Sequence, residues 1–352
     1  MSFSNPWWML ALLSALLTII PTAALSSSSG ASAVAARLPP NILRSSKDYH
    51  LLEVVPHDKT SFTDRYERFR QQGLTYYNGH IYEGTGLEEE SHILQHDPAD
   101  KMTTLNKVPV KPRHLFGEGI SYYYIWKTDG NGHRVKENRL IQLTWRDQVG
   151  FIYSLPDLKV IKEFKYDTTT GEGWGITFVE HTNEFYVSDG SEYLMVWDAE
   201  TLEEKRRITV VFDAGSQNVT VNLVNELEFI DFTSDHTCMP EISENSSNAD
   251  SSSENNECPK SAQTSAFTSS MRILANIWYQ DILVSIDPTS GWVKKVYNLN
   301  DIYPVSQRHE DGSDCLNGIS VTGKQPLIGN SGVQVWVTGK WWPNMFRIQL
   351  ID

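Results

Sequence analysis

Basic side chains and cysteines are scarce in this 352-residue sequence. Lys and Arg number 30 against 44 Asp and Glu, which gives a formal net charge of -14 at pH 7. This balance argues against nucleic acids and anionic membrane surfaces as main partners, because both repel an acidic protein. A small, neutral or cationic substrate fits the charge better.

Long apolar patterns with helical spacing are also absent. Short runs rich in Val, Ile, Tyr, Trp and Phe occur instead, and Gly, Asp, Asn and Pro separate them. Such a pattern is typical of strands joined by turns. We therefore predict an all-β protein, and its hydrophobic content of 40% suffices for a substantial core.

The usual motifs of catalytic zinc sites are missing as well. None of the ten histidines belongs to an HExxH motif, and Cys315 has no second cysteine at CxxC spacing. His57 and His96 each precede an aspartate, but we doubt that these pairs bind metal. We expect that catalysis requires no cofactor, neither a metal nor a nucleotide. A structural calcium ion held by carbonyl and carboxylate oxygens stays open.

The N-terminal segment has the features of a targeting signal. The first 36 residues carry no charged side chain, and the apolar stretch "WWMLALLSALLTII" is followed by small residues. This order predicts a secretory signal peptide and a small-residue linker over residues 1–36, and therefore a secreted protein or one in the endomembrane lumen. An uncleaved signal that anchors the chain to a membrane is the alternative.

Two further features are compatible with a secretory compartment. Cys238 and Cys258 can close a disulfide loop there, and free thiols are the alternative. Asn218 and Asn245 each begin an Asn-X-Ser/Thr sequon, which would be glycosylated only in a secretory lumen.

One strand-turn-strand phrase recurs along the chain. Its four full copies are "HILQHDPADKMTTLNKV", "GFIYSLPDLKVIKEFKY", "YLMVWDAETLEEKRRITV" and "ILVSIDPTSGWVKKVYNL". The turns fall at Asp97, Leu155, Asp198 and Asp287, at intervals of 58, 43 and 89 residues. Such spacing is typical of propeller blades. The longest interval contains the Ser- and Asn-rich segment 239–266, which we expect to be a disordered insertion.

A fifth copy begins at "WWPNMFRIQLID", but the sequence ends before its last strand. The segment "YHLLEVVPH", residues 49–57, has strand composition and precedes the first copy. We predict that it pairs with the last blade and closes the ring. The domain then spans residues 48–352 as a five-bladed β-propeller closed by its N-terminal strand. A β-sandwich would explain neither the repeat nor the incomplete copy.

A second phrase recurs upstream of each turn, as "QQGLTYY", "GEGISYYY", "GWGITF", "NELEFIDF" and "LNGISV". Each begins a predicted innermost strand, and innermost strands line the channel of a propeller. The residues at the starts of these strands should therefore meet at one mouth of the channel. They are Gln72, Glu118, Trp174, Asn225 with Glu226, and Asn317.

These phrases, together with "VVPHDKTSF", "EGTG", "FGEGI", "LTW", "GFIY", "SDG", "ANIW" and "VTGKWWP", resemble the glutaminyl-peptide cyclotransferases of the plant and bacterial type. That family consists of five-bladed propellers unrelated to the zinc-dependent animal enzymes. The resemblance covers most of the chain after residue 48. Three insertions depart from the family pattern: "TDRYERFR" before "QGL", "KTDGNGHRVKEN" in the second blade, and the Ser- and Asn-rich segment in the fourth.

The resemblance implies a catalytic acid at Glu118 in "FGEG". It also implies substrate-binding positions, which are Gln72, Trp145, Trp174, Asn225, Trp278 and Lys340. Each residue type has an ordinary structural role too. Tryptophan more often packs in a core, lysine is more often a solvated strand end, and asparagine more often satisfies a turn.

The implied activity converts N-terminal glutaminyl residues of peptides and proteins to pyroglutamyl residues and releases ammonia, which makes the protein an acyltransferase. Glu118 would act as general acid and base, its flanking glycines would let the backbone approach the substrate, and the tryptophans would exclude water. A non-catalytic peptide-binding propeller is the main alternative. A propeller hydrolase or lactonase would need a metal cluster on the channel axis. We expect a monomer whose partners are its peptide substrates.

Overall fold

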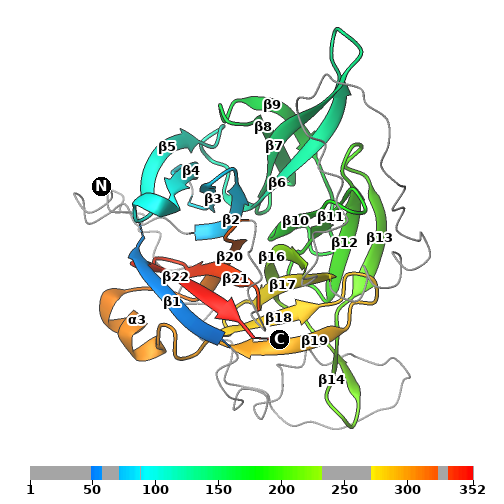
Figure 1. Ribbon diagram of the computed structural model, residues 1–352. Coiled ribbons are helices and arrows are strands. Elements are labelled where there is room, and N and C mark those ends of the chain that lie inside the picture. Colours follow the sequence, from blue (N-terminus) through cyan, green and yellow to red (C-terminus); the bar gives the residue numbers. More distant parts are fainter. Residues whose placement is uncertain (1–48, 58–70, 88, 232–270, 324–331, 352) are drawn as a thin grey trace, which may run out of the picture. The chain divides into compact units, whose positions relative to one another are not determined.

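The short β-branched and aromatic runs form antiparallel strands, and the strands assemble into five four-stranded sheets (Figure 1). The computed structural model describes residues 49–57, 71–87, 89–231, 271–323 and 332–351. Every described residue belongs to the unit that spans residues 35–352. Four predicted features lie outside the described residues: the signal and linker (1–36), the insertion (239–266), the cysteine pair Cys238 and Cys258, and the sequon at Asn245.

The strands of each blade follow one another from the channel outward. Blade one contains β2 (Gln71–Tyr77), β3 (His80–Thr85), β4 (His92–Asp97) and β5 (Thr103–Pro109). Blade two contains β6 (Gly117–Thr128), β7 (Arg134–Thr144), β8 (Val149–Ser154) and β9 (Val160–Lys165). Blade three contains β10 (Ile176–Val179), β11 (Glu184–Val187), β12 (Tyr193–Asp198) and β13 (Glu204–Thr209).

Blade four contains β16 (Val224–Asp231), β17 (Met271–Ile277), β18 (Ile282–Ile286) and β19 (Val293–Asn298). Blade five contains β20 (Leu316–Val321), β21 (Gln334–Gly339), β22 (Asn344–Leu350) and β1 (Tyr49–Pro56). The remaining elements are the hairpin strands β14 (Val211–Asp213) and β15 (Asn218–Thr220), the short helix η3 (Pro98–Asp100) and helix α3 (Val305–Asp311). No helix among the described residues is long and apolar enough to cross a membrane.

The innermost strands contact one another in a closed ring, in the order β2, β6, β10, β16, β20 and back to β2. The ribbon shows the five sheets arranged around the axis that this ring encloses (Figure 1). The prediction of an all-β, five-bladed propeller is therefore confirmed.

The N-terminal strand closes the ring, as predicted. β1 pairs antiparallel with β22, from Tyr49 opposite Leu350 to Pro56 opposite Asn344. It thereby supplies the outer strand that blade five lacks, so the first and the last strand of the fold share one sheet.

A buried ion pair extends this closure toward blade one. His57 follows β1, and its Nε2 lies 3.0 Å from Glu83 Oε2 in β3, while His96 Nε2 in β4 lies 2.8 Å from the same oxygen. Burial by itself would raise the pKa of Glu83, but the charges and hydrogen bonds of the two histidines lower it to about 2. An ionised carboxylate thus ties the end of the closing strand to the neighbouring blade.

Three aspartates form the turns that the repeat predicted between the third and fourth strands. The carboxylates of Asp97, Asp198 and Asp287 each accept a hydrogen bond from the backbone N–H two residues later. Aspartate stabilises a turn in this way because its short side chain replaces a backbone acceptor.

The innermost strands approach so closely that glycine follows most of the strand-start residues. A Cβ on Gly119 would lie 2.4 Å from Trp174 O, and one on Gly175 would lie 2.2 Å from Asn225 O. No side chain fits at these distances. We expected the glycines beside Glu118 to admit the substrate, but the structure shows that Gly119 admits the backbone of the next blade.

Blade four departs from this pattern, because Glu226 stands where the other blades have glycine. Its Oε1 accepts a hydrogen bond of 2.7 Å from Leu74 N–H of blade one, and Ile319 N–H of blade five bonds the same carboxyl group. Burial is the main cause that raises the pKa of Glu226 well above its usual value. A single buried carboxyl group therefore joins three blades.

A second glutamate in blade four replaces a hydroxyl residue. In the first three blades a Ser or Thr oxygen accepts a backbone N–H from the next blade; the pairs are Thr75 with Tyr122, Ser121 with Phe178, and Thr177 with Phe229. Glu228 occupies the equivalent position, and its Oε1 accepts from Val321 N–H at 2.8 Å. Burial raises the pKa of Glu228 to about 8.

The hydrophobic core lies between neighbouring blades. Between blades three and four, for example, Val179 and Val196 pack against Leu227, Ile273 and Val284, and all five side chains are buried. Such interdigitation holds the sheets at fixed angles around the axis. The strand starts at the mouth are therefore rigidly placed.

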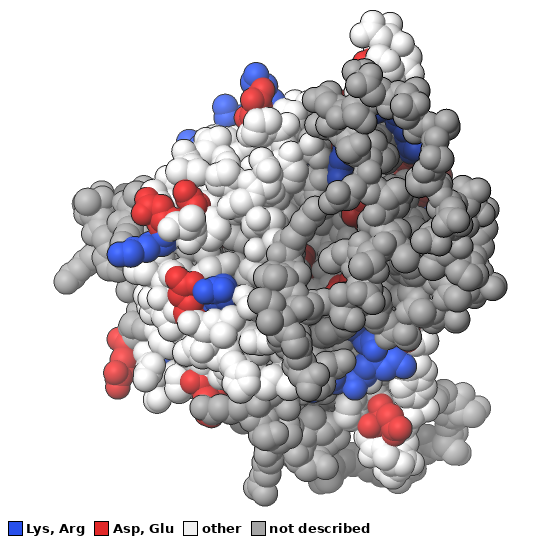
Figure 2. Space-filling view, viewed as in Figure 1, with Lys and Arg blue, Asp and Glu red and all other residues white. Residues whose placement is uncertain are grey.

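The insertion "KTDGNGHRVKEN" lengthens the β6–β7 hairpin, whose pairing continues to Thr128 opposite Arg134. The hairpin projects from blade two at the top of Figure 1. Where described residues are visible in Figure 2, acidic and basic side chains are interspersed and form no continuous basic surface. This distribution agrees with the negative net charge.

Candidate functional site

The structure brings the five predicted strand-start residues to the same end of the innermost strands. Gln72, Glu118, Asn225 and Asn317 lie in the first residues of β2, β6, β16 and β20, and Trp174 lies two residues before the start of β10. A register shift marks the start of all these strands except β10, because two residues of the inner strand face one on its neighbour. These bulges turn the side chains toward the mouth of the channel.

A chain of amide groups crosses this mouth. Asn225 Nδ2 donates to Asn317 Oδ1 at 3.0 Å, and Asn317 Nδ2 donates to Gln72 Oε1 at 3.1 Å. We call these three residues the amide chain. It joins blades four, five and one, and each of its members is at least 96% buried. Gln72 Nε2 is fully buried and has no hydrogen-bond partner among the described residues.

Glu118 lies at the start of the inner strand next to that of Gln72 and is only 6% exposed. Gly119 N–H donates to Trp174 O at 2.8 Å, so the backbone around Glu118 is bonded directly to the indole-bearing loop of blade three. Burial, with the charges of Glu118 and Asp147, raises the pKa of Tyr166. The Glu118 carboxyl group acts electrostatically on the Tyr166 phenol, and it does not face bulk solvent.

One carboxylate holds two of the predicted tryptophans. Glu172 Oε2 accepts hydrogen bonds from Trp145 Nε1 and Trp174 Nε1, each at 2.9 Å, while Glu172 Oε1 lies 2.8 Å from Arg146 Nε. Burial alone would raise the pKa of Glu172, but these three hydrogen bonds lower it. The Arg146 guanidinium also stacks over Trp145, 3.7 Å from the ring centroid.

The indole rings continue toward blade four. Trp174 and Trp278 meet edge to face with ring centroids 5.3 Å apart, and Phe116 lies 5.5 Å from Trp145. Gly190, in the "SDG" turn, leaves room for the Trp174 ring, because a Cβ there would lie 2.5 Å from it. The predicted tryptophans thus form one aromatic wall from blade two to blade four.

Lys340 follows β21 and is anchored in blade five. Its N–H donates to Cys315 O at 2.9 Å, and its carbonyl accepts from Asp314 N–H at 2.8 Å. Burial raises the pKa of the Cys315 thiol to about 11, and the positive charge of Lys340 opposes that rise. Lys340 is half-buried, and it follows the end of β21 that lies opposite the start of β20, so it stands at the blade-five side of the mouth.

Two residues of the site were not predicted. Glu172 stands two residues before Trp174 in "GEGWG", but only the fold shows that its carboxylate also reaches Trp145 of another blade. Tyr166 gave no signal in the sequence, because it lies after the fourth strand of blade two and reaches the mouth through its hydroxyl, which donates to Thr144 O.

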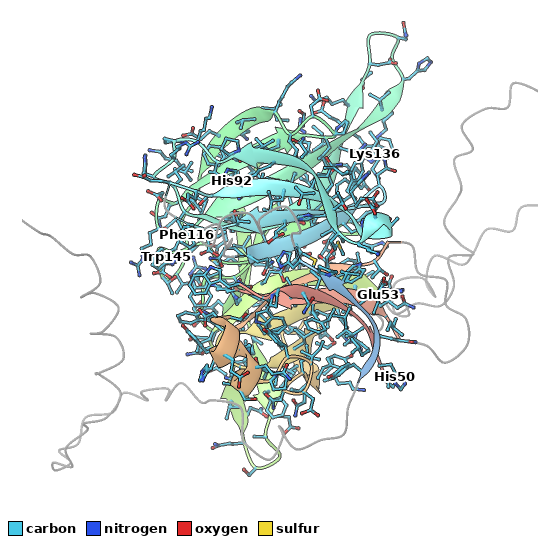
Figure 3. All side chains as sticks on the ribbon, turned by 90° about the vertical axis from the view of Figure 1, so that its left-hand side faces the viewer. His50, Glu53, His92, Phe116, Lys136 and Trp145 are labelled. Carbon is cyan, nitrogen blue, oxygen red and sulfur yellow. The ribbon has the colours of Figure 1, made fainter. Side chains whose placement is uncertain are left out.

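The side view places Trp145, the blade-two end of the aromatic wall, on one face of the propeller (Figure 3). In Figure 3, Phe116 and Trp145 lie together at the left edge, whereas Lys136 of the projecting hairpin lies at the right. Figure 2, drawn in the orientation of Figure 1, therefore looks at the face opposite the site.

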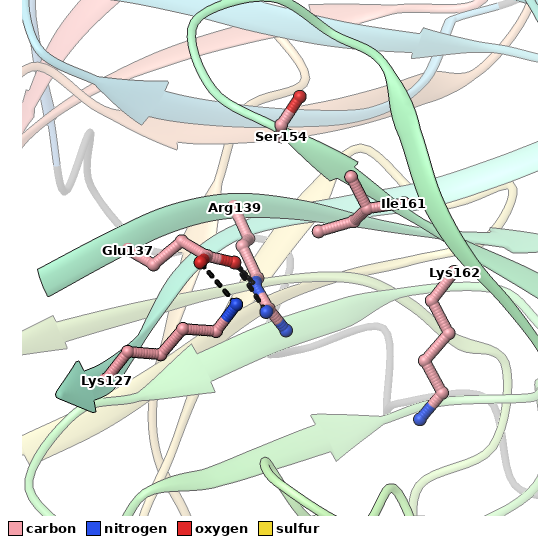
Figure 4. A pocket seen from close by; sticks show the side chains of 6 residues that line it. All are labelled: Lys127, Glu137, Arg139, Ser154, Ile161 and Lys162. Carbon is pink, nitrogen blue, oxygen red and sulfur yellow. Dashed lines mark hydrogen bonds and ion pairs between the residues drawn. The ribbon is translucent and has the colours of Figure 1, made fainter. Parts of the chain in front are cut away.

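A pocket of about 470 Å³ lies elsewhere, between the β6–β7 hairpin and β9 (Figure 4). Its charged lining is already neutralised in part, since Glu137 pairs with Lys127 and Arg139 at 2.5 Å each. None of the predicted site residues lines it. Convergent buried polar groups define a functional site better than hollow shape alone, so we assign the site to the channel mouth.

Metal binding finds no support at the mouth. Among the described residues, no group of three or more His, Cys, Asp or Glu side chains has the arrangement to hold a metal ion. Catalysis without a cofactor therefore stays a prediction. A structural calcium ion stays an open question.

Both the sequence and the fold of this chain are similar to those of known proteins. A family model described as glutamine cyclotransferase matches residues 19–235 and 266–350. A protein of Arabidopsis thaliana, glutaminyl-peptide cyclotransferase, is 27% identical over 309 residues, which cover 85% of this chain and 71% of that protein. The crystal structure of Myxococcus xanthus glutaminyl cyclase matches with a TM-score of 0.55 at 21% identity, over 86% of this chain and 97% of that one.

Proposed function

Since this chain belongs to the glutamine cyclotransferase family, as its motifs indicated, we propose that it converts N-terminal glutaminyl residues of peptides and proteins to pyroglutamyl residues and releases ammonia. The observation that carries this proposal is the position of Glu118. Glu118 is only 6% exposed, it lies at the start of the inner strand next to that of Gln72, and the following residue bonds to the Trp174 carbonyl. A buried carboxyl group among convergent polar and aromatic side chains is a candidate for a catalytic acid or base.

The reaction needs a proton-transfer group from the protein, but it needs no nucleophile from the protein. The substrate's own α-amine attacks the side-chain amide carbon, and this amine has a pKa of roughly 7.7 to 8.0, so much of it is unprotonated near neutral pH. The difficult step is the departure of ammonia. We assign Glu118 to both transfers: its carboxylate accepts a proton from the attacking amine, and the resulting acid protonates the leaving nitrogen.

The amide chain supplies the groups that hold the reacting amide. Gln72 Nε2 is a donor without a partner among the described residues, so it can bond the carbonyl oxygen on which negative charge develops. Lys340, on the blade-five side, supplies a positive charge toward the same oxygen. Asn225 accepts from the amide nitrogen.

The aromatic wall folds the substrate and excludes water. Trp145, Trp174 and Trp278 present indole surfaces that can hold the α-amine close to the side-chain carbonyl, which removes rotational freedom before the reaction. Any protonated amine would be attracted to the indole faces by cation-π interaction.

Incubation of the purified protein with a short glutaminyl peptide tests the proposal. We expect release of ammonia and a product lighter by the mass of one ammonia molecule, and the rate should be unchanged by a chelator. A protein that binds the peptide but leaves its mass unaltered would be a peptide-binding propeller. Loss of turnover on chelation, restored by added metal, would contradict the cofactor-free mechanism.

Glu172→Gln should loosen the aromatic wall. The glutamine oxygen can still accept from the indoles, but more weakly than a carboxylate oxygen does. Its NH₂ group faces Arg146, so the ion pair and its hydrogen bond are lost. We expect KM for a glutaminyl peptide to rise about tenfold, with a smaller change in kcat and a red shift of tryptophan emission. Arg146→Gln is the control, since it also removes the ion pair but leaves the charged carboxylate to accept both indole bonds. Equal effects of the two changes would contradict a positioning role for Glu172.

We further propose that the protein acts in the secretory pathway, as a monomer. The N-terminal sequence supports this location, and Asn218, the start of a sequon, is exposed on the β14–β15 hairpin where a glycan can be attached. Protein recovered from the medium of a eukaryotic host should lose mass on glycosidase treatment. Retention of the unglycosylated full-length chain inside the cells would contradict this location.

A further inference from the structure

We propose that Asn317 is a positioning residue that sets the direction of the amide chain and thereby makes the site select a side-chain amide over a carboxylate. This inference rests on the proposed function and adds to it the basis of glutaminyl specificity. It starts from a single hydrogen bond whose direction is unambiguous.

That bond fixes the orientation of the Asn317 amide. Asn317 Nδ2 lies 3.1 Å from the backbone carbonyl oxygen of Gln71, and a carbonyl oxygen only accepts. The group facing Gln71 must therefore be the NH₂ of Asn317. Its Oδ1 must point the other way, because the two atoms are the two ends of one planar amide.

The orientation passes to Asn225 in blade four. Asn317 Oδ1 is an acceptor, so Asn225 has to present its Nδ2, which donates at 3.0 Å. Asn225 Oδ1 is then left as an acceptor, and no described residue donates to it. The same reasoning applies to Gln72 in blade one, because the second hydrogen of Asn317 Nδ2 binds Gln72 Oε1 at 3.1 Å. Gln72 Nε2 is left as a donor.

The chain thus ends in one donor and one acceptor of fixed identity. A glutaminyl side chain offers a carbonyl oxygen and an NH₂ group, which match Gln72 Nε2 and Asn225 Oδ1. A glutamyl carboxylate offers two acceptors, so its second oxygen would face Asn225 Oδ1 without a proton between them. Sites built on buried hydrogen bonds discriminate strongly in this way, because a mismatch leaves a buried group unpaired.

Asn317 touches neither of the substrate groups in this scheme. It acts by preventing rotation of its two neighbours. Without it, the amides of Asn225 and Gln72 can each turn over, and the site can present donors to either oxygen of a carboxylate. The buried position of Asn317, which is 0% exposed, excludes water as a replacement partner of fixed direction.

The test compares wild type with Asn317→Leu, a change of similar volume that removes every hydrogen bond of the side chain. We measure kcat/KM for a glutaminyl peptide and the inhibition constant of the otherwise identical glutamyl peptide at neutral pH. We expect kcat/KM to fall about 10- to 100-fold, and the preference for the glutaminyl peptide over the glutamyl peptide to fall about tenfold. Asn317→Ala, which adds no atoms near the axis, replaces Asn317→Leu if that variant does not fold.

Asn276→Leu is the matched control. Asn276 is also fully buried and bonds two backbone groups, Glu226 N–H and Leu316 O, but it does not belong to the amide chain. It should lower stability while keeping the preference between the two peptides. An Asn317 variant that turns over with an unchanged preference would overturn the inference and leave the proposed function standing. Wild-type protein that releases no ammonia from the glutaminyl peptide would overturn the proposed function itself.

Discussion

Glu118→Gln should leave the propeller folded and lower kcat for a glutaminyl peptide by a factor of about 10² to 10⁴, the range that a general acid and base typically contributes. Glutamine keeps the shape of the side chain and its capacity to accept a hydrogen bond, but it cannot take up or return a proton. KM should change little, because the amide chain and the aromatic wall stay in place. Steady-state kinetics with ammonia detection measures both constants.

Two companion variants separate proton transfer from general damage. Glu118→Asp keeps the acid but withdraws it by one methylene group, so its kcat should lie between those of wild type and Glu118→Gln. Glu163→Gln removes the same charge on the exposed strand β9 and should behave as wild type. A Glu118→Gln variant with kcat within about threefold of wild type would remove Glu118 from the mechanism.

Glu228→Gln should make the protein more stable in alkaline solution. Burial raises the pKa of Glu228 from 4.5 to about 8, so folding favours the protonated carboxyl. That contribution is complete below about pH 4.5, the pKa of the unfolded chain, and it is lost as the pH rises through 8. The full loss amounts to on the order of 5 kcal/mol. Glutamine remains neutral throughout and retains the acceptor for Val321 N–H.

Thermal unfolding followed from pH 5 to pH 9 measures this effect. The melting temperatures of wild type and Glu228→Gln should be similar at pH 5 and should diverge progressively as the pH rises from there to about 8, with the variant several degrees higher at pH 9. Glu163→Gln again serves as the control, because its exposed carboxyl carries the same charge without the burial. If the melting temperatures of wild type and Glu228→Gln changed in parallel with pH, ionisation of this carboxyl group would not destabilise the fold.

The fold was predictable because its signals are local or repeated. Asp97, Asp198 and Asp287 each form a turn with backbone only two residues away, so the sequence neighbourhood contains the whole interaction. The closing strand was predictable for a related reason, since the incomplete last copy required a strand and residues 49–57 had the composition of one. Figure 1 shows β1 in that place.

The strand-start residues of the site were predictable from the same repetition, but their interactions were not. The departure of "NELE" from the "GIS" and "GIT" phrases is visible in the sequence, yet the raised pKa values of Glu226 and Glu228 depend on how tightly five strands meet. The link from Glu172 to two indoles likewise depends on the distance between blades. Single-sequence patterns contain no measure of such distances.

The direction of the amide chain is a further property that composition and spacing cannot supply. Asparagine and glutamine each offer a donor and an acceptor, so their presence at a strand start leaves both orientations open. Only the contact of Asn317 with the Gln71 carbonyl decides between them. The glycine beside Glu118 shows the same limit, because close approach was predictable and the approaching group was not.

The pairing of β1 with β22 also has a consequence for synthesis. The ribosome makes β1 first and β22 near the end, and at about 5 to 20 residues per second the interval between them is roughly 15 to 60 s. Throughout that time the nascent chain has no partner for its first strand, whose Leu51, Leu52 and Val54 remain partly exposed even in the finished fold. Chaperone contacts during translation would therefore have their greatest value at this first strand.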